Sequence, residues 1–134
     1  MPQLDSMIVS QRANAEYYEC YLRLDRPTLC HENPRAYYNR FMYPIVFPST
    51  ERRDAIGVFL RCRGIDTSKP YEDVIGGATN RYGYEGDCPV AERLLRQTLV
   101  IPSYFKLKPR DIKHIVKSLN QGYSIADKDW ELPA

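Results

Sequence analysis

The residues best suited to chemistry lie in a polar segment that follows Ile65 and runs to Asp87. This segment, DTSKPYEDVIGGATNRYGYEGD, holds four glycines, and we expect no helix or strand within it. A connection of that length is usually functional or a linker. Its most suggestive residue is Lys69, since a lysine forms a Schiff base when desolvated or binds an anionic group when exposed. Because Lys69 lies between Ser68 and Pro70, we expect an exposed side chain, with anion binding as the functional alternative.

Tyrosines and carboxylates accompany this lysine. Tyr71, Tyr82 and Tyr84 are amphipathic rings that suit a ligand pocket or an interface, although covering the core is an equally good role. Acid–base chemistry would need two carboxylates held at a fixed separation in a concave site, and the spacing here establishes no such pair. We therefore expect surface charges or helix caps from the five acids, which are Asp66, Glu72, Asp73, Glu85 and Asp87.

Common catalytic and nucleotide-binding motifs are absent. The sequence contains no GxGxxG, GxxxxGK[ST], HExxH or GxSxG, and Gly76–Gly77 indicates a flexible turn. Two of the four cysteines, Cys20 and Cys62, fall in expected helices, where we predict reduced and partly buried thiols. A zinc site can be imagined from three residues whose spacing matches no common ligand pattern, which are Cys30, His31 and His114. We expect no metal site, and a solvated His114.

The totals exclude several classes of protein. A formal net charge of +2 over 134 residues is too small to indicate nucleic-acid binding. The longest apolar run is far shorter than the ~20 residues of a membrane span. The first residues have neither a basic leader nor an apolar core typical of a signal peptide. The cysteine usage favours a reducing, cytoplasmic location.

The first half of the chain predicts two helices and one strand. Helical spacing of apolar residues runs over 4–24, broken only at Gln11. Aromatic and β-branched residues over 37–47 predict a strand, with Pro44 indicating an edge position or a bulge. A second helix follows, with Ser49 or Thr50 as its cap and Gly64 as its C-terminal residue. Its expected buried stripe is Ala55, Ile56, Phe59, Leu60 and Cys62 or Arg63.

The second half predicts helix, strand and helix. Asp87 and Pro89 suit a helix start, and TLVIP at 98–102 suits a buried strand. Three residues should turn that helix inward, namely Ala91, Leu94 and Leu95. The last helix begins near Pro109 and is expected to end at Gly122, before a tail at 123–134. Its buried stripe is Ile112, Ile115, Val116 and Leu119. Two layers, a small sheet covered by helices in one α/β (α+β) domain, would bury every apolar stripe.

Three blocks of sequence resemble the C-terminal portion of the DegT/DnrJ/StrS-type sugar aminotransferases. The first element matches that family at Arg12, Ala15, Tyr18 and Leu22. The second matches at Gly64, Ile65 and Thr67. The third and most specific, CPVAERLLRQTLVIPSY, matches at Pro89, Val90, Ala91, Glu92, Leu99, Pro102 and Tyr104. The resemblance covers nearly the whole chain and implies the small domain of a pyridoxal-phosphate enzyme of the aspartate aminotransferase fold (fold type I).

The resemblance also implies what this polypeptide does not supply. In that family the cofactor lysine, and most groups that bind the cofactor, precede the matching region, so we expect no catalytic residue here and no activity of this chain alone. Many members carry a histidine near the strand that here reads NRFMYPIVF, where there is none. The residues that the resemblance places toward a keto-sugar nucleotide are Thr67, Lys69 and Tyr71, with Arg81 and Tyr82 as weaker additions.

Partners follow from the same resemblance. The helix at 4–24 would link to a large domain, so part of its apolar stripe should be exposed or covered by a second copy, which predicts a homodimer. An alternative is a stand-alone binding or regulatory module that kept the fold and lost the chemistry. A third reading, an RNA-binding sandwich with aromatics on its sheet, is disfavoured by the near-neutral charge and the absence of an RNP-like motif.

Overall fold

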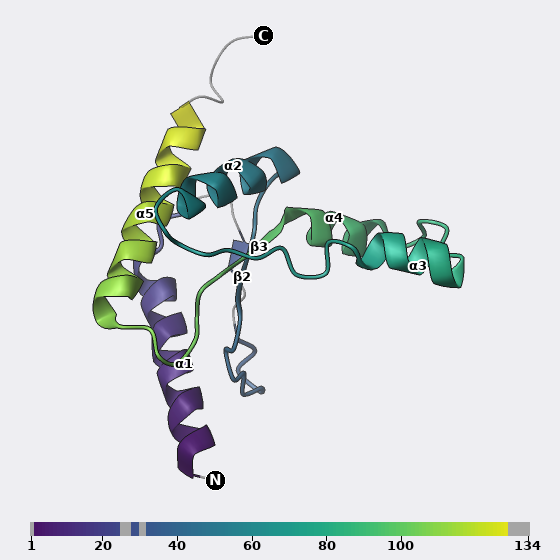
Figure 1. The fold of residues 1–134 in the computed structure, drawn as a ribbon. Coiled ribbons are helices and arrows are strands. Elements are labelled where there is room, and N and C mark those ends of the chain that lie inside the picture. The colour runs from purple at the N-terminus through teal and green to yellow at the C-terminus, as the bar shows by residue number, and fades with distance from the viewer. Residues whose placement is uncertain (1, 25–27, 30–31, 129–134) are drawn as a thin grey trace.

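The computed structural model describes residues 2–24, 28–29 and 32–128. Five helices and three strands are assigned over these residues (Figure 1). Their bounds are α1 Pro2–Tyr21, β1 Thr28–Leu29, β2 Tyr43–Val46, α2 Thr50–Arg61, α3 Val74–Tyr82, α4 Pro89–Gln97, β3 Thr98–Ile101 and α5 Pro109–Lys128. Two of the zinc candidates, Cys30 and His31, lie outside the described residues, as does the end of the tail at 129–134.

The sheet is antiparallel, in the order β1-β2-β3. The strand expected over 37–47 is wrong in length, because only Tyr43–Val46 form β2. Arg40 adopts a left-handed backbone with φ of 56°, which cannot continue an extended strand. The chain therefore enters β2 only after this turn.

Pro44 lies in the central strand, so its expected edge position is wrong. The Phe47 N–H donates to the Gln97 carbonyl at 2.9 Å, so alternate residues of β2 bond toward β3 and Pro44 faces the β1 side. The described pairing with β1 ends at Ile45, opposite Leu29. Because the ladder needs no donor at Pro44, the ring is tolerated there.

The core forms where α2, α5 and α1 meet the sheet. Helix α5 packs against α2 and α1, and α2 packs against β3 (Figure 1). The predicted stripe of α5 is confirmed, since Ile112, Ile115, Val116 and Leu119 are all buried. Each fully buried aliphatic side chain of this kind contributes ~1.5–3 kcal/mol. These contacts confirm the α+β fold with a small sheet covered by helices.

The ends of α2 follow the signals in its sequence. The Ser49 side chain accepts the Arg52 N–H at 3.2 Å and so caps the first turn, as predicted. At the other end Gly64 has φ of 73°, its N–H donates to the Arg61 carbonyl, and the Ile65 N–H donates to the Leu60 carbonyl. This pair of bonds is a Schellman motif, and it confirms Gly64 as the helix-ending glycine.

The polar segment after Ile65 contains a helix, α3, that the sequence analysis did not predict. Helix α3 includes Gly76 and Gly77, so the expected flexible turn there is wrong. Two glycines disfavour a helix by ~1 kcal/mol each relative to alanine, which conceals it from pattern reasoning. The helix ends at Gly83, whose φ of 66° is the left-handed conformation typical of a C-terminal glycine.

Helix α4 begins near the expected residue, but a different residue hydrogen-bonds to its N-terminus. No side-chain cap bond is found at its N-terminus, so the cap expected from Asp87 is wrong. The Tyr84 hydroxyl instead accepts the Cys88 N–H at 2.9 Å and donates to Glu92 Oε1 at 3.0 Å. The inward face expected for α4 is also wrong within this chain, since none of its residues is buried, and Ala91 and Leu94 are exposed.

Further corrections concern the end of α5 and the burial of three single residues. Helix α5 continues past Gly122 to Lys128, so that glycine does not end the helix and the tail begins as helix. Cys20 and Cys62 are exposed rather than partly buried. Ala55 is exposed as well, and the buried face of α2 contains Arg53 in addition to the expected Ile56 and Leu60.

Two parts of the molecule extend away from the core. Helices α3 and α4, which with their connection (residues 74–97) we name the arm, project to one side of the sheet (Figure 1). The N-terminal half of α1 extends beyond α5 at the opposite edge and exposes Leu4 and Val9. No helix in the described ranges is long and apolar enough to cross a membrane.

Candidate functional site

The 66–72 segment, which connects α2 to the arm, is fixed to the sheet at one residue. The Ser68 N–H donates to the Val100 carbonyl at 3.1 Å, and the Val100 N–H donates to the Ser68 carbonyl at 2.8 Å. This two-bond bridge lies beside β3, on the flank opposite β2. It places Thr67, the threonine of the motif noted above, at the end of the sheet.

A cavity of about 230 Å³ opens at this point. Its lining comes from the residue two positions before β2, from the 66–72 segment, and from the end of β3 with the residues that follow it. The lining residues are Phe41, Asp66, Thr67, Ser68, Val100, Ile101, Pro102, Ser103 and Tyr104. The Thr67 Oγ1 atom is buried and has no hydrogen-bond partner in the described part of the chain. A buried hydroxyl without a partner costs free energy, so Thr67 would gain from a further hydrogen bond. Its Oγ1 atom lies near α2, 3.9 Å from a Cβ built on Gly57.

Two aromatic rings mark the exposed rim of the cavity. Phe41 is 58% exposed and Tyr104 is 53% exposed. Phe41 stands near the start of β2, the region where the resembling family often has a histidine. With the Asp66 carboxylate and the Thr67 hydroxyl, the cavity can stack against a ring and hydrogen-bond to hydroxyl groups.

Lys69 belongs to a neighbouring cluster of charges and does not line the cavity. Its Nζ lies 2.6 Å from Asp54 Oδ1 and 3.8 Å from Glu72 Oε1, and its side chain is 28% exposed. Arg53 contacts the same two acids, through Nε to Asp54 Oδ1 at 2.9 Å and Nη2 to Glu72 Oε1 at 3.1 Å. The expected exposed lysine is therefore partly covered and ion-paired.

The charges of this cluster shift the ionisation of Asp54. Burial alone would raise the pKa of the Asp54 carboxyl, but hydrogen bonds from Lys69 and Arg53 outweigh it and hold that pKa below its ordinary value. The carboxylate is thus the stable form beside two cations. The 2.6 Å contact with this carboxylate does not favour a free amine at Lys69.

The other residues expected at the site are dispersed. Tyr71 is exposed next to the cluster and has a left-handed backbone with φ of 65°. Arg81 and Tyr82 lie on α3, where they line a shallow groove with Val74, Gly77 and Ala78. Tyr82 is 84% exposed. The structure thus joins Thr67 to the cavity and leaves Arg81 and Tyr82 on the arm.

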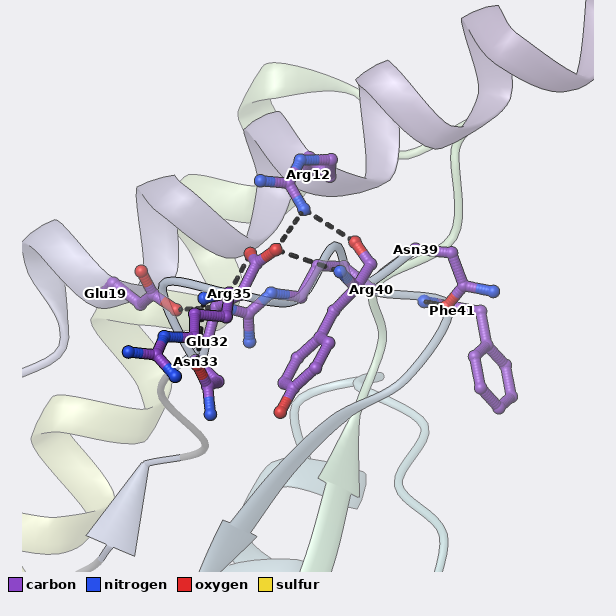
Figure 2. Close-up of polar contacts among 9 residues, drawn as sticks. Arg12, Glu19, Glu32, Asn33, Arg35, Asn39, Arg40 and Phe41 are labelled. Atoms are coloured by element: carbon purple, nitrogen blue, oxygen red, sulfur yellow. Dashed lines mark hydrogen bonds and ion pairs between the residues drawn. The ribbon is translucent and has the colours of Figure 1, made fainter.

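A second polar cluster supports the cavity from α1. Figure 2 shows Arg12 and Glu19 reaching from α1 toward Glu32 and Arg40. Arg12 Nη1 donates to Glu32 Oε1 at 2.9 Å and to the Tyr38 carbonyl at 2.7 Å. The buried guanidinium of Arg40 lies 3.0 Å from Glu19 Oε1 and 3.5 Å from Glu32 Oε2. These contacts line a hollow of about 240 Å³ and join α1 to the segment that leads into β2.

Ionisation in this second cluster follows its hydrogen bonds. The hydrogen bond from Arg12 and the backbone N–H of Tyr38 lower the pKa of the Glu32 carboxyl. The same carboxylate raises the pKa of the Arg12 guanidinium through their hydrogen bond. Charged forms are therefore favoured on both sides, which is typical of a structural ion pair.

Sequence reasoning missed the residues that hold the rim. The Ser103 hydroxyl donates to the Arg40 carbonyl at 3.1 Å, and Asn14 Nδ2 donates to the Tyr104 carbonyl at 3.0 Å. Both bonds join parts of the chain that are far apart in sequence. Asn14 lies inside the helical motif that contains Arg12, which was the available signal, whereas nothing in the sequence marks Arg40.

Metal binding finds no support in the described ranges, where no group of three potential ligands comes together. His114 is exposed, as expected, and its Nε2 lies 3.1 Å from the Arg63 carbonyl. Because Cys30 and His31 fall outside those ranges, the zinc candidate that includes them is untested.

Comparison with known proteins places this geometry in a family. The model of the DegT/DnrJ/EryC1/StrS aminotransferase family matches residues 1–120. A search of curated protein sequences found no match.

Solved structures with the same fold include several aminotransferases. The aminotransferase TlmJ from Streptoalloteichus hindustanus has 24% identity and a TM-score of 0.81, with 94% of this chain and 34% of TlmJ aligned. The apo-form of the putative sugar aminotransferase Spr1654 from Streptococcus pneumoniae has 16% identity and a TM-score of 0.83, with 98% of this chain and 34% of Spr1654 aligned. DesV from S. venezuelae, in complex with a ketimine intermediate, has 25% identity and a TM-score of 0.75, with 87% of this chain and 32% of DesV aligned.

The chain spans about a third of the length of these solved structures. The family model, by contrast, matches nearly the whole of this chain. This chain therefore belongs to the DegT/DnrJ/EryC1/StrS aminotransferase family.

Proposed function

We propose that this chain is the small, C-terminal domain of a pyridoxal-phosphate-dependent aminotransferase that acts on a keto-sugar nucleotide. Residues 1–134 form one domain in this proposal, and α1 links it to a large domain. The observation that carries it is that Phe41 and Thr67 line the same cavity. This cavity joins the residues just before β2 to the segment after Ile65, the two regions that the family resemblance assigns to the substrate side.

The cofactor belongs, in this proposal, to the other two-thirds of the enzyme. Solved structures of Spr1654 include forms with pyridoxal phosphate and with its amino form. When bound, the cofactor carries the amino group, and its aldehyde needs a lysine while its phosphate needs donors or cations. The described lining of the cavity offers neither lysine nor arginine, and Lys69 is ion-paired to Asp54. These residues do not fit the cofactor, so we propose that this chain is inactive alone.

Thr67 is the leading substrate contact in this proposal. Thr67 lines the cavity and its buried hydroxyl has no partner in the described part of the chain, and Tyr71 follows on the same segment. Arg81 and Tyr82 are weaker candidates, because they lie on the arm and could reach substrate only if another domain brought it there. Bound sugars commonly meet such hydroxyls and aromatic rims.

The apolar surface that the fold leaves exposed on α1 suggests which partners the chain has. We propose that the exposed apolar half of α1, with Leu4 and Val9, is covered by the large domain or in a homodimer. We propose a cytoplasmic enzyme, since the described cysteines are unpaired. Nucleic acid and membranes are not among the proposed partners.

The claim of inactivity can be tested with the chain alone. Mixing it with pyridoxal phosphate, trapping with borohydride and mapping adducts by mass spectrometry should give only scattered, substoichiometric labelling of surface lysines. A stoichiometric adduct at one lysine would contradict the proposal. The variant Lys69→Met identifies whether any such adduct is at that residue.

The substrate contact can be tested by NMR titration with UDP-glucose and dTDP-glucose. We expect the largest amide shifts at Thr67 and Ser68, with weak binding that Thr67→Val abolishes. Thr79→Val is the matched control, since Thr79 lies exposed on α3 and its hydroxyl donates to the Ile75 carbonyl of the same helix. Shifts confined to other surfaces would refute the assignment. Tight binding by the isolated chain would favour the alternative, a stand-alone binding module.

A further inference from the structure

Four charged residues form a cluster where the 66–72 segment leaves α2 for the arm. Arg53 and Asp54 come from α2, whereas Lys69 and Glu72 come from the segment. The four contacts that join them are 2.6, 2.9, 3.1 and 3.8 Å long. Each cation contacts both acids, so the cluster is a closed network rather than two separate pairs.

The buried member of this network is Arg53, which is only 1% exposed. A buried guanidinium is costly unless its charge is paired. Its partners are Asp54 on its own helix and Glu72 on the segment, and its Nη1 has no hydrogen-bond partner in the described ranges. With few partners available, Arg53 depends on Glu72, and this dependence holds the segment against α2.

The segment is therefore fixed at three points. The backbone bridge holds Ser68 to Val100, the ion pair holds Lys69 to Asp54, and the Arg53 guanidinium holds Glu72. Thr67 directly precedes the first point, Ser68, and is two residues before the second, Lys69. A hydroxyl that binds a ligand must be held to within ~0.5 Å by surrounding contacts, and these three supply such support.

We propose that Lys69 is a tether, by which we mean that its ion pair with Asp54 holds the 66–72 segment to α2, and that it does not contact ligand. Arg53 and Asp54 are then positioning residues for Thr67. This inference rests on the proposed function in one respect, that Thr67 contacts substrate. An anion that binds Lys69 would compete with Asp54, which lies 2.6 Å from Nζ and also contacts Arg53. The network thus reassigns the lysine that sequence reasoning places beside the substrate.

Amide hydrogen exchange on the whole chain tests the tether without any ligand. In Asp54→Asn and Lys69→Met, the Ser68 and Val100 amides should exchange at least ~10-fold faster than in the parent, because each loses one fixed point of the segment. The Phe47 amide, bonded to Gln97 in the β2–β3 ladder, should be unchanged and reports global stability. Lys69→Arg, which keeps the cation, should restore slow exchange. Unchanged exchange at Ser68 in both single variants would overturn the tether.

The affinity for UDP-glucose shows whether Lys69 holds the segment or contacts the ligand, because Asp54→Asn should change that affinity in opposite directions in the two cases. Asp54→Asn frees the Lys69 amine, so a contact would bind UDP-glucose as well as before or more tightly. A tether predicts several-fold weaker binding in Asp54→Asn, and no further loss in the double variant with Lys69→Met. Asp87→Asn and Lys117→Met are matched controls at exposed positions.

The two tests fail in distinguishable ways. If the parent chain binds no sugar nucleotide, the proposed substrate contact fails, while the exchange rates at Ser68 still decide whether the tether exists. If Asp54→Asn unfolds the chain, Lys69→Met and Lys69→Arg decide the same question from the other side of the ion pair. Tighter binding of UDP-glucose by Asp54→Asn would show that Lys69 contacts the ligand, as the sequence analysis proposed.

Discussion

The ring of Phe59 occupies the space that a side chain at Gly122 would need. A Cβ atom built on Gly122 would lie 2.6 Å from Phe59 Cδ1 and 2.9 Å from Cε1. Helix α5 can therefore approach α2 closely only because position 122 has no side chain. The ring is also in contact with Arg63, whose guanidinium carbon lies 3.5 Å from the ring centroid.

Gly122→Ala should destabilise the chain. The added methyl group forces Phe59 off its position and disturbs its contact with Arg63, at a cost of ~1–3 kcal/mol typical of overpacking. Chemical denaturation with a two-state analysis measures this change. Trimming the ring in the double variant Phe59→Leu with Gly122→Ala should recover part of the loss.

Gly77→Ala on α3 is the matched control for that variant. Nothing lies within 4 Å of a Cβ built there, so the methyl group only improves helix propensity, by ~0.5–1 kcal/mol. The two substitutions should therefore have opposite signs. Stabilisation by Gly122→Ala would contradict the packing role assigned to this glycine.

Tyr18→Phe should lower stability in a manner that depends on pH. The buried hydroxyl donates to the Pro102 carbonyl at 2.6 Å, and its loss costs ~1–2 kcal/mol. Burial raises the pKa of Tyr18 above its ordinary value. An acid with a raised folded pKa contributes its full stability below the unfolded pKa of ~10 and loses it as pH rises further.

The difference between the parent and Tyr18→Phe should therefore shrink above ~pH 10, where the unfolded tyrosine ionises. Urea denaturation at pH 7 and pH 10.5 measures both differences. Tyr82→Phe, at an exposed ring, is the control and should change stability at neither pH. A constant difference for Tyr18→Phe would refute the environment assigned to its hydroxyl.

Much of the fold was accessible from sequence where local signals agreed with packing. The stripe of α5, the Ser49 cap and the Gly64 stop were all predictable, because each depends on neighbours along the chain. Gly122 misled the prediction for the opposite reason, since its role is set by Phe59 on another helix. Helix α3 was hidden by its two glycines, although it ends at Gly83 in the left-handed conformation typical of a C-terminal glycine.

The candidate site was predictable only in part. The motif around Thr67 pointed to the residue that lines the cavity, although no pattern showed that Phe41 or Tyr104 would join it. Lys69 was noticed for its chemistry, but its engagement with Asp54 could not be foreseen, because a helix and a later segment meet only in three dimensions. Periodicity also assigned α2 an apolar face and so missed the buried Arg53.

Glu32→Gln should loosen the attachment of α1. The variant removes one carboxylate from Arg12 and Arg40, and the contact with Arg12 joins α1 to the segment that leads into β2. We expect a lower melting temperature, and a smaller response to added salt than in the parent. Glu16→Gln is the control, since Glu16 lines the same hollow but is exposed. Equal melting temperatures for the parent and Glu32→Gln would show that the cluster contributes nothing measurable.

The ionisation of Asp54 provides a direct measurement of the network around Lys69. The hydrogen bonds from Lys69 and Arg53 outweigh burial and lower the pKa of this carboxyl. A carboxyl with a depressed folded pKa contributes stability above its unfolded pKa of ~3.9, and this stability is lost as pH falls through the folded pKa. A carbon-detected NMR titration should therefore place the Asp54 midpoint below that of an unfolded aspartate.

Lys69→Met should raise that midpoint, because the variant removes the nearer ammonium and leaves Arg53 as the remaining cation. Since the Asp54 side chain is 43% exposed, salt should weaken the shift in the parent. Lys117→Met, at an exposed position on α5, should leave the midpoint where it was. If Lys69→Met and Lys117→Met give the same midpoint as the parent, the 2.6 Å contact between Lys69 and Asp54 does not persist in solution, and the network that supports Thr67 lacks its central bond.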